Sequence, residues 1–470
     1  MKKIAISSVI CFLVFSFVIF PAFSNEYYGR DVPDSSEIRQ KLVDKWFNQD
    51  LKYLRQQESE HYENVLEQKF EVRMEEVDDD VFAIIVAPAK TIEMDLVSSS
   101  GTKTTSVNVY PYDLAGSWIL FRDKKTGNPI SVRYYFHKNS QIFVEFQTED
   151  IPDANVAMKK KRNNEKVYGN FLLFDMFLAK NIPVGLTIDS LYTMSFTEVV
   201  ENTRICLPWE YAKVETNLYD GNLQMIGYIR EKLPTIVLEN DACYDGSYRP
   251  IKISTGEFRD ETAKDNGLSL DNFGFTKWII DGIVRPVAGS CLELAPLKVP
   301  TMTLKIGSKA DTLADKYNQY FALDWTRNLA AACLSVISGD KYTYENSGCE
   351  VSIRPFSSQY TQKGTKSIPV YIKDSGYSVE TLKALFYIFA VKEPDRFYLA
   401  AVRETDESVP QNVFYARTVA FFPYFDAEGD YFVSVFENAR EYTLEEFMEN
   451  NAQLFVNLVR VQSSQRFFPQ

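Results

Sequence analysis

Apolar residues near the start of the chain recur at the spacing of one face of a helix. The residues at this spacing are Ile38, Leu42, Trp46, Leu51 and Leu54. The pattern predicts a helical segment over 25–75, with a capping residue at Asp34 or Ser35.

The next block, 76–203, consists of short apolar runs between turn residues. "VFAIIVAP" is one such run, and "IEMDLVSSSGTKTTSVNVYPY" predicts two strands around a glycine turn. "SWILFRDKKTGNPISVRYYFHKNSQIFVEFQTE" predicts three more strands. Evenly spaced strands are typical of a small sandwich or barrel. We therefore expect a β-rich, sandwich-like domain over 76–203.

A helical pattern returns over 204–250, which we interpret as a helical linker, and 251–470 predicts a further domain. In that domain, helices precede three strands, "RFYLAAVRE", "NVFYARTVAFFPYF" and "DYFVSVFEN". "TLEEFMENNAQLFVNLVRV" then predicts a closing helix. Helices followed by an antiparallel meander are an α+β pattern, so the expected fold class is α+β.

The N-terminus has the layout of an export signal. Lys2 and Lys3 precede the apolar run Ile4–Phe20, and "PAFS" supplies the small residues of a cleavage site after Ser24. The other interpretation is an uncleaved membrane anchor, because the run is almost long enough to span a bilayer. We expect 1–24 to be a signal peptide and the protein to be periplasmic or extracellular. A membrane contact would come only through an uncleaved signal segment.

Charge and composition narrow the range of partners. The formal net charge of −13 disfavours nucleic acid and anionic lipid. The basic run "KKKR" at 159–162 lies in a polar connection and is typical of a solvated loop.

Five cysteines follow the predicted signal peptide, namely Cys206, Cys243, Cys291, Cys333 and Cys349. Disulfides can form outside the cytoplasm, and an odd number leaves at least one thiol without a partner in the chain. The spacing leaves the connectivity open. The sequence has no C-x-x-C pair for zinc or thioredoxin-like chemistry.

Histidine is scarce, which limits the available chemistry. His61 lies on a charged face of the predicted helix and His137 lies beside a turn, so we expect both on the solvated surface. Neither is in the C-terminal half, where a nucleophile would lack its base. The sequence also lacks the phosphate-loop, dinucleotide, metalloprotease and nucleophile-elbow motifs, so we expect no cofactor and no metal. The many acids leave a two-carboxylate glycosidase open without singling out a pair.

The stretch "LDNFGFTKWIIDG" begins a predicted helix and contains four residues of a known motif, Leu270, Asp271, Gly274 and Phe275. It resembles the nucleophile helix of NlpC/P60-type, papain-like cell-wall peptidases, whose motif is L-D-C-S-G-F-V. Asn272 stands where that family has its cysteine, and Phe273 where it has serine. A thiol at a helix N-terminus is acidified by the helix dipole, whereas a carboxamide cannot attack a carbonyl.

The same resemblance places the family's histidine at the start of a later strand, here "ARTVAFFPYF". Arg417 or Thr418 occupies that position, and neither is a general base at neutral pH. The resemblance therefore implies a degenerate domain without catalytic residues. It also implies a groove that involves Asp271, Trp278 and Tyr415.

A structural interpretation of the same residues stays open. Asp271 or Asn272 would cap the helix, while Gly274 and Phe275 would be close-packing residues. The insertion over about 285–395 departs from the family pattern, so an unrelated α+β domain is the alternative.

Three functions are compatible with these patterns. The first is an exported, non-catalytic protein that binds peptidoglycan, a glycan or an envelope protein, or scaffolds an envelope assembly. The second is an active cell-envelope hydrolase with a non-standard nucleophile such as Cys291 or Cys243, which lie in loop-like sequence. The third is a purely structural envelope protein.

Overall fold

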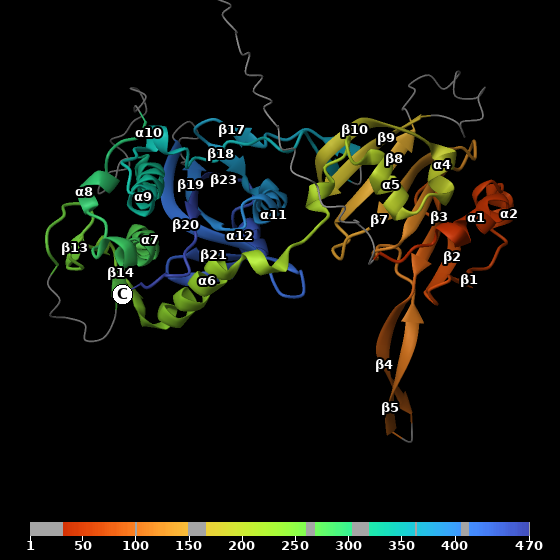
Figure 1. Cartoon of the computed structure of the whole chain (residues 1–470), viewed down its shortest axis with the longest axis horizontal. Helices are drawn as coiled ribbons and strands as arrows, with labels where there is room; N and C mark the ends of the chain where they lie inside the picture. Colours follow the sequence, from red (N-terminus) through yellow and green to blue (C-terminus); the bar gives the residue numbers. More distant parts are fainter. Residues whose placement is uncertain are drawn as a thin grey trace, which may run out of the picture.

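The computed structural model describes residues 32–98, 101–148, 166–259, 268–302, 319–361, 364–405 and 413–469. Figure 1 shows two β-rich halves beside each other, the N-terminal half in red to yellow and the C-terminal half in green to blue. The predicted signal peptide and the "KKKR" run lie outside the described residues. No helix in the described ranges is both long and apolar enough to cross a membrane.

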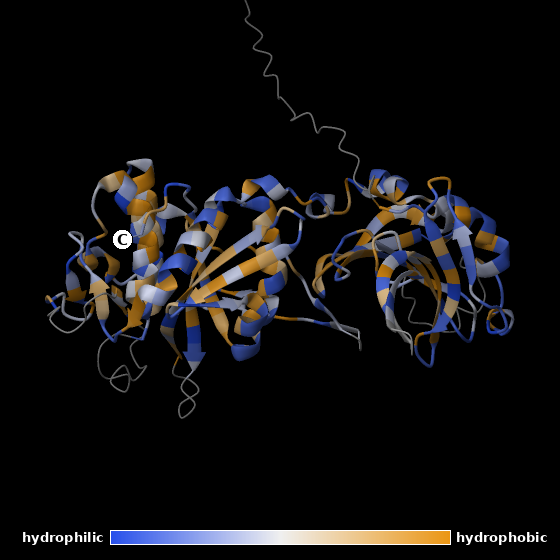
Figure 2. Cartoon of the chain, turned by 90° about the horizontal axis from the view of Figure 1, so that it is seen from below, coloured by the Kyte–Doolittle hydropathy of each residue, from blue (hydrophilic) through white to orange (hydrophobic). Residues whose placement is uncertain are grey.

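The N-terminal half is built on one antiparallel meander. Its strands are β1 (Glu60–Glu63), β2 (Lys69–Glu76), β3 (Val81–Pro88), β6 (Trp118–Asp123), β7 (Pro129–Tyr135), β8 (Ile142–Thr148), β9 (Lys166–Leu173) and β10 (Met176–Thr187). Each strand pairs with the next in this order. Figure 2 shows the sheet strongly curved. The prediction of a β-rich block is confirmed, although the strands form one curved sheet with helices against it rather than two facing sheets.

Short helices cover one face of this sheet. They are α1 (Ser36–Leu42), η1 (Val43–Phe47), α2 (Leu51–Leu54), α4 (Ile188–Thr193) and α5 (Phe196–Thr203). Alternate strand residues such as Ile84, Leu120 and Val144 point into a core shared with Leu42 and Leu191. The helical prediction for 25–75 is therefore correct only over part of the range, at 36–54, because β1 and most of β2 also lie in it.

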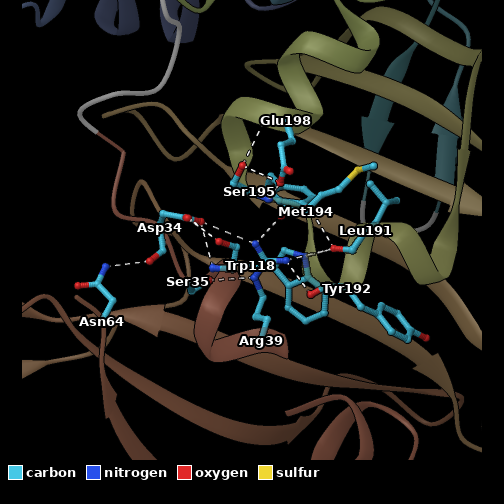
Figure 3. A network of polar contacts seen from close by, with 12 residues as sticks. Asp34, Ser35, Arg39, Asn64, Trp118, Leu191, Tyr192, Met194, Ser195 and Glu198 are labelled. Atoms are coloured by element: carbon cyan, nitrogen blue, oxygen red, sulfur yellow. Dashed lines mark hydrogen bonds and ion pairs between the residues drawn. The ribbon is translucent and has the colours of Figure 1, made fainter. Parts of the chain in front are cut away.

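Arg39 links α1 to the C-terminal end of α4 within this helical layer (Figure 3). Its guanidinium donates to the backbone carbonyls of Leu191, Tyr192 and Met194, at the C-terminal end of α4, at 3.2, 2.8 and 2.6 Å. It also lies over the Trp118 ring, 5.1 Å from the centroid. The last carbonyls of a helix have no partner inside the helix, and they favour a cation. The buried arginine therefore pairs with the Tyr192 carbonyl and shares the Leu191 and Met194 carbonyls with the Tyr134 hydroxyl.

Two strands leave the sheet as a separate hairpin. β4 (Lys90–Ser98) and β5 (Gly101–Val109) pair along their whole length, as the sequence predicts. Figure 1 shows this hairpin projecting away from the body of the protein.

The region between the halves contains short elements. These are η3 (Trp209–Tyr211), η4 (Thr216–Leu218), α6 (Asp220–Lys232), η5 (Leu233–Thr235), β11 (Ile236–Leu238), β12 (Ala242–Tyr244), β13 (Pro250–Lys252) and β14 (Leu268–Leu270). The predicted helix in the linker is α6. Asn222 on α6 donates to the carbonyls of Arg396 and Pro423, so this helix is anchored to the C-terminal sheet.

The C-terminal half is a helix–sheet–helix arrangement. Its sheet has the strand order β17 (Tyr371–Ile372), β18 (Gly376–Ser378), β23 (Phe455–Gln462), β19 (Arg396–Thr405), β20 (Val413–Phe425), β21 (Tyr431–Glu437) and β22 (Arg440–Thr443). Its helices are α7 (Asn272–Ala288), α8 (Leu294–Leu297), α9 (Phe321–Ser338), α10 (Tyr344–Ser347), η7 (Val379–Thr381), α11 (Leu382–Lys392) and α12 (Leu444–Asn450). α7 and α9 share a core with Phe397 and Leu399, whereas α11 packs on the opposite face with Tyr398 and Ala400.

The fold class is α+β, as predicted. One element of this half differs from its prediction, because the expected closing helix is a short helix followed by a strand. α12 ends at Asn450, and the apolar residues after it form β23 in the middle of the sheet. The run "FVNLVRV" suits a strand that is covered on both faces, a pattern that periodicity does not distinguish from a buried helix.

The halves interlock rather than meeting at a simple linker. The hairpin β15 (Gln359–Thr361) and β16 (Gly364–Lys366) comes from the C-terminal half but extends the N-terminal sheet next to β10. Lys138 and Asp430 form an ion pair between the halves at 2.6 Å.

Candidate functional site

The N-terminus of α7 is held in place by its own capping residue and by a close contact with β12. The Asp271 carboxylate accepts a hydrogen bond from the backbone N–H of Gly274 at 2.6 Å, so Asp271 is the N-cap. A Cβ on Gly274 would lie 2.2 Å from the carbonyl oxygen of Ala242. Glycine is therefore required here by the packing of helix against strand, and Gly274 is a close-packing residue, as the structural interpretation predicts.

Asn272 and Thr418 are in direct contact across the interface between α7 and β20. The Asn272 carboxamide donates to the Thr418 carbonyl oxygen at 2.9 Å and accepts from the Thr418 backbone N–H at 2.5 Å. The same oxygen accepts from the Thr418 hydroxyl at 2.9 Å, and the Asn272 amide also donates to the side chain of Asn438. Asn272 therefore joins helix to strand with both ends of its side chain.

Thr418 completes the junction from the strand. It is fully buried, and its hydroxyl lies 3.1 Å from that of Thr276 on the next turn of α7. Asn272, which the resemblance places at a missing nucleophile, is thus a neighbour of Thr418, one of the two residues that it places at a missing base. None of the groups in this contact titrates near neutral pH.

Arg417, the other candidate for the histidine position, points away from this junction. Adjacent residues of a strand face opposite sides of the sheet, and the Arg417 guanidinium binds Glu404, Glu437 and Asn451. Burial alone would lower the pKa of Arg417, but the carboxylates of Glu437 and Glu404 outweigh burial and raise it. Arg417 therefore stays charged and is already paired within the protein.

The two aromatic residues assigned to a groove are core residues. Trp278 and Tyr415 are each only 3% exposed. Trp278 stacks on Phe275, and the Tyr415 hydroxyl donates to the carbonyl of Asp374. Both side chains are therefore packing elements of this conformation rather than the walls of an open groove.

The alternative nucleophiles are unsuited to attack a substrate. Cys243 is fully buried, and burial raises the pKa of its thiol to about 12. Cys291 is 7% exposed, and burial together with Asp281 raises the pKa of its thiol to about 11. The thiolate is the reactive form of cysteine, so both groups are inert at neutral pH.

Next to these thiols is an ion pair that sequence reasoning missed. Lys277 and Asp281 lie one turn apart on α7 with 2.6 Å between ammonium and carboxylate, and the Lys277 side chain is 1% exposed. Asp281 also accepts from the backbone N–H of Leu292. The signal for this pair was a lysine and an aspartate four residues apart in an otherwise apolar helix.

The two histidines differ in environment. His61 is exposed, as predicted, and lies 3.5 Å from Glu71, but it is on strand β1 and not on the predicted helix face. His137 is buried, contrary to the prediction, because α11 covers the turn on which it lies. Its Nδ1 accepts from the backbone N–H of Asn139, so the proton of the neutral ring is on Nε2, directed at the Tyr387 hydroxyl 3.2 Å away. Burial lowers the pKa of His137 to about 4.

Other parts of the molecule offer little additional chemistry. A cavity of about 250 Å³ lies between α9 and the ends of β19 and β23. Cys333, Cys349, Arg396 and Arg460 are among its lining residues, whereas Asn272 and Thr418 do not line it. In the part of the chain that the structure describes, no group of three or more His, Cys, Asp or Glu side chains could hold a metal ion.

The five cysteines are all unpaired in this structure. Cys206 is exposed, whereas the other four are buried, namely Cys243, Cys291, Cys333 and Cys349. Cys206 is therefore the most accessible thiol of the five.

Comparison with known proteins concerns the N-terminal half. Residues 29–211 match a family described as a domain of unknown function, DUF8515. The match includes β1 to β10 and the Arg39 network and ends before α7. No curated protein and no solved structure matches the chain.

Proposed function

We propose that this is an exported, non-catalytic protein whose C-terminal half is a degenerate relative of papain-like cell-wall peptidases. Its role would be to bind a cell-wall, glycan or protein ligand, or to scaffold an envelope assembly. The observation that carries the proposal is the contact between Asn272 and Thr418. The resemblance assigns Asn272 to the nucleophile position and Thr418 or Arg417 to the base position. Side chains that form hydrogen bonds but do not titrate fill both.

The signal-like sequence over 1–24 supports a location outside the cytoplasm. The environments of Cys243 and Cys291 count against the hydrolase alternative. A signal-like segment over 1–24 is expected to direct the chain out of the cytoplasm. Neither Cys243 nor Cys291 has an accessible, acidified thiol. A peptidase that used one of them would need a large rearrangement around α7.

Incubation of the purified protein with peptidoglycan sacculi tests the proposal. We expect the protein to sediment with the sacculi while no new amines are released, and C243S and C291S to behave like the wild type. Amine release that disappears in either variant would establish the hydrolase instead. If the protein neither sediments with the sacculi nor releases amines from them, that result would contradict a cell-wall ligand.

Alkylation of the native protein tests the thiols directly. We expect rapid labelling of Cys206 and slow labelling of Cys243 and Cys291 until denaturant is added, because the latter two are buried with raised pKa values. Fast native labelling at Cys243 or Cys291, located by peptide mass spectrometry, would favour the catalytic alternative.

A further inference from the structure

The β4–β5 hairpin, here called the arm, forms a sheet of its own, and no other strand of the described residues pairs with it. Its strands pair from Lys90 with Val109 to Ser98 with Gly101. They form a two-stranded sheet of their own, and the main contacts of each strand are with the other. An isolated two-stranded hairpin is only marginally stable in water, so a ribbon that projects this far (Figure 1) would gain from a partner.

Alternation along the strands gives the arm one apolar face and one polar face. The more apolar face carries Ile92, Met94, Val107 and Val109, and by the same pairing also Thr105 and the two lysines of the arm, Lys90 and Lys103. Met94 is 42% exposed, so this face is not buried against the body of the protein.

The outer edges of the two strands differ in charge. β4 carries Glu93 and Asp95 near its centre, and charged residues on an edge oppose pairing with another strand. β5, "GTKTTSVNV", has Lys103 as its sole charged residue and is rich in threonine and valine, which favour strands. The β5 edge is therefore the one suited to receive another strand.

We infer that the arm pairs with the arm of a second copy of this chain, β5 against β5, antiparallel about Thr105. In this register Thr105 faces its own counterpart, Thr104 faces Ser106 of the second copy, and Lys103 faces Val107 of the second copy. Threonine and serine pairs across antiparallel strands are favourable, and no like charges are opposed. The equivalent pairing of β4 with β4 about Met94 would place Glu93 against Asp95.

Charge also favours a second copy as the occupant. The chain has a net charge of −13, which makes most surfaces of two copies repel each other. Between 90 and 109 there are two lysines and two acids, so the arm is neutral. Two copies can thus approach arm to arm without that repulsion.

The size of the contact predicts a weak association. Nine residues of strand extend roughly 30 Å, and pairing along one edge buries less area than a standard stable interface. We therefore expect a monomer–dimer equilibrium that depends on concentration rather than a permanent dimer.

Sedimentation equilibrium of the mature protein, from low micromolar to near-millimolar concentration, tests the inference. We expect the average mass to rise towards that of a dimer in the wild type and to remain that of a monomer in T104K/S106K. In that variant the new lysines face Asp95 and Glu93 within their own arm, so the arm is retained, but they oppose each other between copies. The matched control is V65K/L66K, which adds the same charge at exposed positions outside the arm and should associate like the wild type.

A wild type that stays monomeric at the highest concentration would overturn the inference, as would a T104K/S106K variant that associates normally. Cross-linking gives a second measurement that does not depend on the lysine variant. In a C206S background, T105C should form an intermolecular disulfide under mild oxidation, because the two thiols meet at the symmetry axis. T102C, opposite Asn108 in this register, should not. Absence of the T105C cross-link would equally overturn the pairing.

Discussion

At the scale of single residues, Asn272 shows how one side chain can fit two interpretations of a sequence. The proposed resemblance would make it the replacement for a nucleophile, and its contacts make it a structural link between helix and strand. The N-cap is Asp271 rather than Asn272, which leaves the Asn272 carboxamide free to bond to β20. The sequence could place both residues at the start of a helix. It could not reveal the link to Thr418, because the two residues are 146 positions apart.

Replacing Asn272 with alanine should destabilise the protein by about 2–4 kcal/mol. The substitution leaves the buried backbone N–H and carbonyl of Thr418 without their partner, and unsatisfied buried groups carry the full cost of desolvation. Urea unfolding of N272A measures the loss. The control is N202A, because Asn202 lies on an exposed helix surface and should change the unfolding free energy by less than about 0.5 kcal/mol. Equal effects for the two variants would show that the link is energetically unimportant.

At the scale of elements, the success of sequence reasoning depends on how each element is buried. The hairpin of β4 and β5 and the meander of β6 to β8 were predicted because turn residues bound each strand. β23 was taken for a helix because a strand covered on both faces loses its alternation, as Val456, Leu458 and Val459 illustrate. The burial of His137 was missed because it depends on a distant part of the chain. The residue that covers it, Tyr387 of α11, lies 250 positions further along.

The Arg39 network provides a test of how short elements are held together. R39M should lower the free energy of unfolding by at least about 3 kcal/mol, because several hydrogen bonds from a charged group to the end of α4 are lost together. R55M is the matched control, since Arg55 forms only an exposed ion pair with Glu76 and should contribute less than about 1 kcal/mol. Thermal and urea denaturation would both report the difference. A loss in R39M no larger than in R55M would contradict the role assigned to Arg39.

At the scale of the whole molecule, His137 lies where the halves meet. It is on the turn between β7 and β8, and its ring contacts Tyr387 of α11 in the C-terminal half. The Tyr387 hydroxyl in turn donates to the carbonyl of Tyr211. This chain of bonds requires a neutral imidazole, because Nδ1 must accept from Asn139. The interface between the halves is therefore sensitive to protonation.

Stability should fall as the pH is lowered from about 6.5 to about 4. The folded pKa of His137 is about 4, below the ordinary value of 6.5, so the unfolded chain takes up a proton in this interval before the folded chain does. The contribution of neutral His137 to the free energy of unfolding is fully present above pH 6.5 and reaches about 3 kcal/mol at most. Urea unfolding across this range should show a smaller pH dependence in H137Q than in the wild type. H61Q, which alters the exposed histidine, should keep the pH dependence of the wild type. If H137Q shows that same pH dependence, His137 is not its source.

The hairpin of β15 and β16 has a consequence for the order in which the protein can be completed. The hairpin pairs with the start of β10, where Met176 lies opposite Gln359, whereas β10 itself ends at Thr187. Synthesis proceeds from the N-terminus, so every newly made chain passes through a stage in which β10 is complete but its first residues lack this neighbour. An open strand edge is a template for aggregation. A nascent chain of this protein would thus depend most on chaperones while its second half is still being synthesised.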